Sequence, residues 1–157
     1  MKLALLQTGK TTDESISVLA ALYSSRINRY NPFETLTLPE LRNTKNMPVE
    51  EQKQKEGEKI LQSLRADDYV AILDERGKEM RTVEFSSWLE KSFMLPRKRI
   101  CFVIGGPWGF SDAVYKRADY RISLSKMTFP HQLVRLLFLE QLYRAHTIIK
   151  GDPYHHD

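Results

Sequence analysis

The fold is decided by residues 100–106, which read Ile-Cys-Phe-Val-Ile-Gly-Gly. An unbroken apolar run of this length predicts a strand that is buried on both faces, as in a sheet covered by helices on each side. The two glycines that follow end the strand and would let the backbone approach a ligand closely, because no Cβ intervenes. The single cysteine lies inside the apolar run, so we expect Cys101 to be an inert core thiol.

Strand and helix patterns alternate on both sides of this stretch. Strands are predicted at residues 2–7, 33–38, 69–73, 100–104 and 120–124, and helices at 48–64, 82–94, a short segment from 111, and 133–149. Another helix is predicted between the first two strands, where Ile16, Leu19, Ala20, Tyr23 and Ile27 recur at helical spacing behind the capping candidates Thr11, Thr12 and Asp13. Residues 74–77 are typical of a turn. The pattern predicts an α/β fold, a mostly parallel sheet with helices on both faces.

Length and composition favour a single globular domain over residues 1–157. Hydrophobic residues make up 41% and charged residues 28% of the chain, which is enough apolar material for a packed core. No apolar run is long enough to cross a bilayer, and residues 1–7 are too short for the core of a signal peptide. We therefore expect a cytoplasmic protein with no membrane partner.

The net charge of +4 is unevenly distributed. Residues 1–75 hold 10 basic and 12 acidic side chains, whereas residues 76–157 hold 14 and 8. A positive face in the second half would attract a polyanion such as RNA, although an excess of this size also suits a solvated surface. The basic side chains expected to contact backbone phosphates are Arg97, Lys98, Arg99, Lys116, Arg117, Arg121 and Lys126.

The last predicted helix is apolar on nearly every side. Its apolar residues are Leu133, Val134, Leu136, Leu137, Phe138, Leu139, Leu142, Tyr143, Ala145, Ile148 and Ile149. A helix with no polar side is buried on more than one side. We expect one side to face the sheet and another to face a second copy of the chain in a homodimer. A central core helix within one chain is the alternative.

Three loops leave the expected carboxyl ends of strands, where open α/β sheets bind ligands. They comprise residues 73–77, 105–110 and 124–130, and they could converge on one pocket. The glycine loop lacks the spacing of a dinucleotide fingerprint, and the chain has no phosphate loop ending in Gly-Lys-Ser/Thr, so neither NAD nor ATP is favoured. An ordinary tight turn is the alternative interpretation of the glycines.

The four histidines give no metal site by their spacing. Two lie side by side in the tail, followed by Asp157, and neighbours in sequence rarely point at the same ion. We expect no metal. His131 and His146, at the head of the last helix and within it, are interpreted as capping or packing residues.

Six short motifs occur in a fixed order along the whole chain. They are Gln7-Thr8-Gly9-Lys10, Leu73-Asp74-Glu75-Arg76-Gly77-Lys78, Ile104-Gly105-Gly106-Pro107, the stretch from Leu124 to His131, Glu140-Gln141-Leu142-Tyr143-Arg144-Ala145, and Pro153-Tyr154-His155. Taken together, they resemble the RlmH family of SPOUT methyltransferases. Trp108 departs from the family's glycine loop, and His156 and Asp157 extend past its tail, so these three residues receive no role.

The resemblance implies a fold, a cofactor and a substrate. The fold would be a parallel sheet whose carboxyl-terminal part forms a SPOUT-type trefoil knot, in a homodimer. The enzyme would transfer a methyl group from S-adenosylmethionine to N3 of a pseudouridine in helix 69 of 23S ribosomal RNA, on assembled ribosomes. The implied cofactor pocket comprises Leu73, Gly105, Leu124, Ser125, Lys126, Met127, Thr128 and Phe129.

The implied reaction requires a base and groups that position the acceptor. Methyl transfer is an in-line displacement, and the acceptor N3–H must lose its proton. In the matched tail, His155 is the first candidate for the base, since histidine titrates closest to neutral pH. Tyr154 would orient or stack on the base, and Arg144 would bind phosphate or stabilise negative charge on the ring. The competing hypotheses are a non-catalytic RNA-binding module of the ribosome and a SPOUT enzyme that acts on transfer RNA.

Overall fold

Five parallel strands form one sheet in the computed structural model, which describes residues 1–157. In chain order, the strands are β1 (Lys2–Thr8), β2 (Phe33–Leu38), β3 (Asp68–Glu79), β4 (Arg99–Ile104) and β5 (Tyr120–Ser123). Their order across the sheet is β2-β1-β4-β3-β5, so the apolar stretch that decides the fold lies at the centre. Every residue of β4 is buried. The predicted parallel sheet is confirmed.

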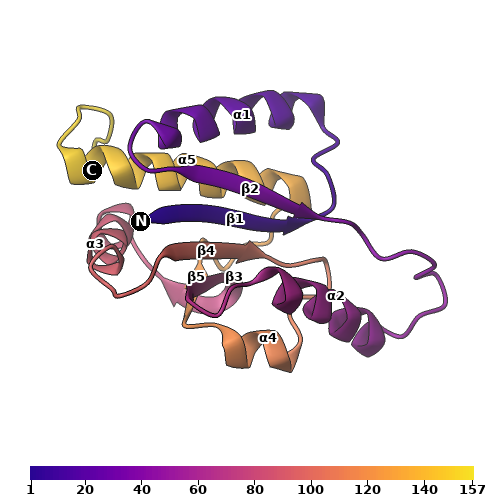
Figure 1. The fold of residues 1–157 in the computed structure, drawn as a ribbon. Helices are drawn as coiled ribbons and strands as arrows, with labels where there is room; N and C mark the ends of the chain where they lie inside the picture. Colours follow the sequence, from indigo (N-terminus) through magenta and orange to yellow (C-terminus); the bar gives the residue numbers. More distant parts are fainter.

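Helices cover both faces of the sheet, as predicted. They are α1 (Glu14–Asn28), α2 (Val49–Ser63), α3 (Thr82–Ser92), α4 (Asp112–Arg117) and α5 (His131–Lys150). Figure 1 shows α1 and α5 side by side on one face and α2 and α4 on the other, while α3 packs against α5. None of the five helices is both long and apolar enough to span a bilayer.

Each face of β4 contributes to a different hydrophobic core. Ile100 and Phe102 point towards α1, α3 and α5, whereas Cys101 and Val103 point towards α2 and α4. Burial raises the pKa of the Cys101 thiol to about 12, so the thiol stays protonated at neutral pH. This agrees with the expected inert core thiol.

The ends of α1 and α5 are fixed by local chemistry. Of the three capping candidates before α1, Asp13 is the cap, and its side chain accepts a hydrogen bond of 3.0 Å from the Ile16 amide. Helix α5 ends at Gly151, whose φ of 76° is a left-handed conformation that glycine adopts without strain. The chain therefore turns back after α5, and the tail lies against that helix.

Much of the all-round apolar character of α5 is used within one chain. Phe138, Leu139 and Leu142 are buried in the larger core, and the helix packs against both α1 and α3. The core-helix alternative thus accounts for part of the pattern. The second copy and the threading of the carboxyl-terminal segment as a knot stay predictions.

The turn predicted at residues 74–77 is wrong as to secondary structure, because β3 continues to Glu79. Leu73 and Lys78 both pair with Ile122 of β5, so the residues between them bulge out of the strand. Asp74 holds the bulge: its carboxylate accepts hydrogen bonds from the Arg76 amide at 3.2 Å and from the Tyr115 hydroxyl at 2.7 Å. The turn-forming residues are thus used inside a strand.

Candidate functional site

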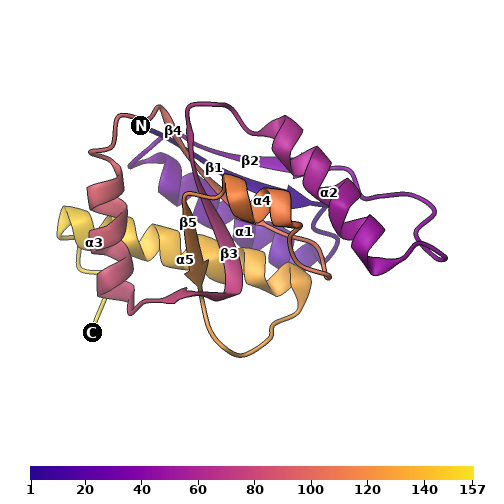
Figure 2. The same ribbon diagram turned by 90° about the horizontal axis from the view of Figure 1, so that it is seen from below.

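A cavity of about 700 Å³ opens at the bulge of β3 and at the carboxyl ends of β4 and β5. Residues from all three stretches singled out in the sequence line it, together with Lys53 of α2 and the start of α5. Figure 2 shows the connections before α4 and before α5 (both orange) approaching each other at this end. The predicted convergence is confirmed, although the first stretch is part of β3 and not a loop.

Seven of the eight residues predicted to hold the cofactor line this cavity. They are Leu73, Gly105, Leu124, Ser125, Met127, Thr128 and Phe129. The eighth, Lys126, is not among the lining residues, and its side chain is 85% exposed with its Nζ atom 3.6 Å from a carboxylate oxygen of Glu79. The loop itself is shaped by a hydrogen bond of 3.0 Å from the Met127 amide to the Ser125 hydroxyl.

The glycine loop is packed so closely that larger residues would not fit. A Cβ on Gly105 would lie 2.9 Å from the ring of Phe110, and one on Gly106 would lie 2.5 Å from a carboxylate oxygen of Glu56. Burial, and then the nearby charge of Glu40, raise the pKa of Glu56. Both glycines line the cavity, and the space that a side chain would need at each position is already filled, so the loop requires glycine there.

His131 lines the cavity, a position that its interpretation as a capping or packing residue missed. Residue Pro130 is the N-cap of α5, and no side chain caps the helix. The Nε2 atom of His131 lies 3.3 Å from the guanidinium of buried Arg135, which also donates to the Thr8 carbonyl at 2.6 Å and to the Thr11 hydroxyl at 3.0 Å. Burial and the charge of Arg135 lower the pKa of His131, so its imidazole is neutral at neutral pH.

The three predicted catalytic residues gather at the other end of α5. Glu140 accepts a hydrogen bond of 3.0 Å from Nε of Arg144 and one of 3.1 Å from the Tyr154 hydroxyl. The Arg144 guanidinium lies 4.7 Å from the centroid of the Tyr154 ring, and its Nη1 atom is 3.4 Å from Nδ1 of His155. We call Glu140, Arg144, Tyr154 and His155 the tail cluster.

Burial and hydrogen bonds set what the tail cluster can do. Burial, followed by the hydrogen bond with Tyr23 and the charge of Glu140, raises the pKa of Tyr154, so this phenol keeps its proton at neutral pH. Tyr154 can therefore donate a hydrogen bond but is a poor base. His155 is packed rather than disordered, with a side chain 14% exposed, and its Nε2 atom is buried without a hydrogen-bond partner.

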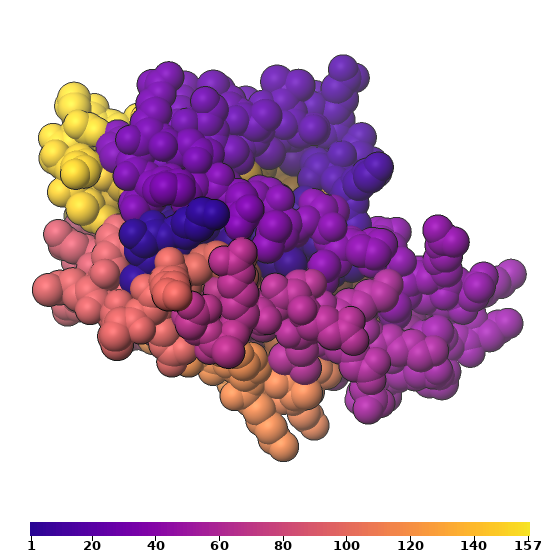
Figure 3. Space-filling view, viewed as in Figure 1, coloured from indigo at the N-terminus to yellow at the C-terminus, as the bar shows by residue number.

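The tail cluster and the cavity lie far apart in one chain. Arg144, Tyr154 and His155 do not line the cavity. The thirteen residue steps along α5 from His131 to Arg144 correspond to about 20 Å at the rise of an α-helix. In Figure 1 the carboxyl end of the chain is at the opposite end of the sheet from the arrowheads of β1 and β2, and Figure 3 shows the tail (yellow) on that far side.

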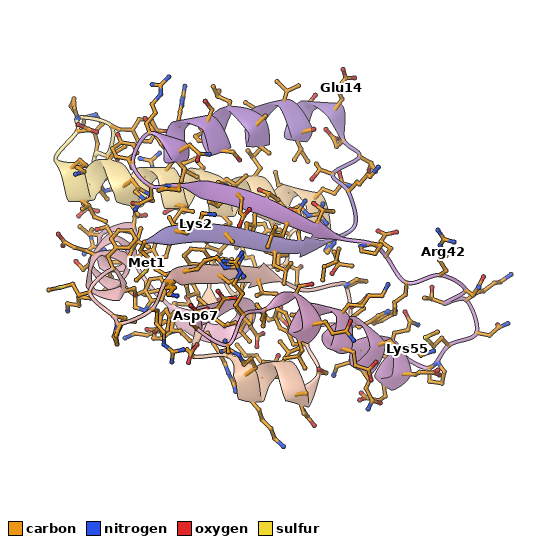
Figure 4. The ribbon with its side chains drawn as sticks, viewed as in Figure 1. Met1, Lys2, Glu14, Arg42, Lys55 and Asp67 are labelled. Atoms are coloured by element: carbon orange, nitrogen blue, oxygen red, sulfur yellow. The ribbon has the colours of Figure 1, made fainter.

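The expected phosphate-binding surface needs one correction, because Arg99 is buried. Its side chain is 2% exposed and donates two hydrogen bonds, of 2.8 and 2.6 Å, to the buried carboxylate of Asp68. Arg117 is also engaged, with Asp119 and with two backbone carbonyls. Figure 4 shows exposed cations elsewhere: Arg42 and Lys55 project from the end of the molecule where β1 and β2 finish.

Comparison with known proteins identifies the family. The family model described as "Predicted SPOUT methyltransferase" matches residues 1–155. This chain belongs to the SPOUT methyltransferases, and within them to the RlmH family. Three relatives carry the name ribosomal RNA large subunit methyltransferase H. The protein from Parabacteroides distasonis is 49% identical over 157 residues, which is 100% of both chains.

The other two relatives are similarly close. The protein from Christiangramia forsetii is 51% identical over 156 residues, 99% of both chains, and that from Bacteroides fragilis is 48% identical over 157 residues, 100% of both. A crystal structure of the SpoU methyltransferase AviRb from Streptomyces viridochromogenes, in complex with the cofactor AdoMet, superposes with a TM-score of 0.46 and 10% identity. That superposition covers 96% of this chain and 61% of AviRb.

Proposed function

We propose that this chain, as a single domain over residues 1–157, transfers a methyl group from S-adenosylmethionine to N3 of a pseudouridine in helix 69 of the large-subunit ribosomal RNA. The cavity at the bulge of β3 and the carboxyl ends of β4 and β5 carries this proposal. Its volume of about 700 Å³ is within the usual range for cofactor sites. The names of the relatives support ribosomal RNA as the substrate class.

The residues that line the cavity suit an adenosine cofactor. Leu73, Leu124 and Phe129 offer apolar surface for a flat ring, and Gly105 contributes backbone to the cavity lining. The cofactor would supply an activated methyl carbon. The protein's part is to hold that carbon in line with the acceptor nitrogen and to remove the proton from the acceptor.

The tail cluster supplies the groups that handle the acceptor. His155 would accept the proton from N3–H, because its Nε2 atom makes no hydrogen bond and lies 3.7 Å from a carboxylate oxygen of Asp157. Tyr154 donates its hydrogen bond to Glu140, and would orient the uracil ring by accepting a hydrogen bond or stack on it. Arg144, held by Glu140 and by the face of Tyr154, would bind phosphate or stabilise negative charge on the ring.

The distance between cavity and tail cluster calls for a second copy of the chain. Since about 20 Å of α5 separate them in one subunit, we propose a homodimer in which the tail cluster of one subunit faces the cavity of the other. Helix α1, which lies beside α5, leaves the side chains of Val18, Leu19 and Leu22 exposed by 64, 43 and 44%. These residues offer an apolar face for the partner.

The substrate is tested by transfer of a labelled methyl group. Assembled ribosomes should accept the label, whereas ribosomes that lack the pseudouridine, transfer RNA and an isolated hairpin should accept little. Labelling of transfer RNA instead would favour the alternative of a SPOUT enzyme with that substrate. Absence of any heat on titration with S-adenosylmethionine would favour the non-catalytic RNA-binding module.

The base is tested by His155→Ala. Turnover at saturating ribosomes should fall by about 10²- to 10⁴-fold, the usual contribution of a general base, while the affinity for S-adenosylmethionine stays the same. The exposed neighbour gives a matched control, since His156→Ala should leave turnover unchanged. Equal turnover of the His155→Ala enzyme and the wild type would remove His155 from the mechanism.

A further inference from the structure

Two exposed apolar side chains stand at the rim of the cavity. Of the eight large hydrophobic residues that the structure leaves exposed, Trp108 and Met127 line the cavity, with exposed fractions of 50 and 76%. They come from different loops, one after β4 and the other after β5. Exposed apolar surface of this kind at a cavity marks a place where a ligand makes contact.

The indole of Trp108 is held by its edge. Its Nε1 atom donates a hydrogen bond of 3.1 Å to the side-chain oxygen of Gln52 in α2. The loop that carries it is a tight turn, closed by a hydrogen bond of 3.2 Å from the Gly109 amide to the Gly106 carbonyl, and Gly109 has a φ of 84°. An edge contact fixes the ring while leaving a face of it open to a flat partner.

The other aromatic rings of the cavity are already engaged. Phe110 is 5% exposed and belongs to the core. Tyr115 is tied through its hydroxyl to Asp74, and the guanidinium of Arg121 covers its ring at 4.6 Å. Phe129 is partly buried between this cavity and a smaller neighbouring one. Trp108 is the aromatic ring that remains available at the rim.

From these contacts we infer that Trp108 stacks on an unpaired nucleobase of the RNA substrate, and that Met127, from the loop after β5, contacts the same RNA. The inference rests on the proposed function. A ring nitrogen can be methylated only when its base has left the helical stack, and proteins receive unstacked bases on aromatic faces. Arg76 also lines the cavity and is exposed without an ion pair, so it is placed to meet an adjoining phosphate. Lys53, another lining residue, lies 3.7 Å from a carboxylate oxygen of Glu50.

Stacking is tested directly by fluorescence. The chain has two tryptophans, and Trp88 is packed among Phe85, Phe102 and Tyr120, so Trp88→Phe leaves Trp108 as the single emitter. A short single-stranded uridine oligonucleotide should quench this emission, and S-adenosylmethionine should leave it unchanged. Quenching by S-adenosylmethionine but not by the oligonucleotide would mean that Trp108 holds the cofactor's adenine, and would overturn the inference.

Kinetics separate stacking from simple burial of apolar surface. Trp108→Ala and Trp108→Leu should each lower kcat/KM for ribosomes by about five- to hundredfold, the range found when a stacking aromatic is removed, while Trp108→Phe keeps most of it. The affinity for S-adenosylmethionine should be unchanged in all three. A leucine variant as active as the phenylalanine variant would contradict stacking.

The contact of Met127 is tested by a variant with a matched control. Met127→Ala should raise the KM for ribosomes, whereas Met94→Ala, which removes an equally exposed methionine after α3, should not. If both leave the KM unchanged, Met127 has no part in the contact. Failure of the proposed function is distinguishable from failure of this inference: in the first case the wild type does not methylate ribosomes at all, and in the second it does while the Trp108 variants match it.

Discussion

The ion pair between Arg99 and Asp68 joins the amino ends of β3 and β4, with side chains 2 and 0% exposed. Removing one partner leaves an uncompensated charge in the core, so Arg99→Met should lower the free energy of unfolding by about 3–5 kcal/mol. Urea denaturation measures this loss. The exposed neighbour gives the control, since Lys98→Met should change stability by less than about 0.5 kcal/mol. Equal stabilities of the two variants would contradict the prediction.

Asp68 adds a dependence on pH at the same site. Burial raises the pKa of Asp68, but hydrogen bonds from Arg99 and from the Arg65 amide outweigh burial and leave the pKa lowered. A carboxyl with a lowered pKa contributes stability that is present above its unfolded pKa of about 3.9 and is lost as pH falls through the folded value. Acid denaturation should therefore be shallower below pH ~4 in Asp68→Asn than in the wild type.

Arg99 and His131 show which features of the site the sequence alone does not predict. Arg99 follows two other basic residues, and the sequence therefore predicts that it contacts RNA. The prediction is wrong because the pairing of β3 with β4 places the carboxylate of Asp68 against Arg99, which the sequence does not show. His131 is interpreted as a capping or packing residue, because the sequence does not show that α5 starts at the cavity. Seven of the eight residues predicted to hold the cofactor line the cavity, since the glycines and loops that follow apolar strands are local features, and their contact with the cofactor stays a prediction.

Among the elements, β3 is the one that the sequence predicted least well. Residues 74–77 have turn chemistry, and a turn was the reasonable interpretation. The irregular strand instead depends on β5, which lies far along the chain and pairs with β3 on both sides of the bulge. The other strands and the helices were found close to their observed bounds because their apolar periodicity is decided locally.

The contact between β3 and β5 can be tested at Gly77. A Cβ at this position would lie 2.8 Å from backbone atoms of Arg121 and Ile122, which cannot rotate away. Gly77→Ala should therefore destabilise the fold by about 1–3 kcal/mol and weaken binding of S-adenosylmethionine, because the adjoining bulge lines the cavity. Denaturation and calorimetry measure the two effects. Lys78→Ala, at an exposed position of the same strand, is the control. Equal free energies of unfolding for the Gly77→Ala and Lys78→Ala variants would refute the close approach.

At the scale of the whole molecule, the question is how a cavity and a tail cluster at opposite ends of α5 can act on one base. If each subunit lends its tail cluster to the cavity of its partner, two different defects can complement each other. A chain with His155→Ala keeps its cavity, and a chain whose cavity is blocked by Thr128→Trp, at an exposed lining position, keeps its tail cluster. A mixed dimer then has one complete site.

Co-expression of these two inactive chains should therefore restore methyl transfer. Random pairing makes about half of the dimers mixed, each with one working site of two, so activity should reach about a quarter of the wild type. Methyl-label transfer onto ribosomes measures the recovery, and native mass spectrometry verifies that mixed dimers form. The double variant, with both changes in one chain, is the control and should stay inactive when it is co-expressed with either single variant. Mixed dimers without recovered activity would mean that each cavity works with the tail of its own chain, which a large movement of residues 151–157 would then have to explain.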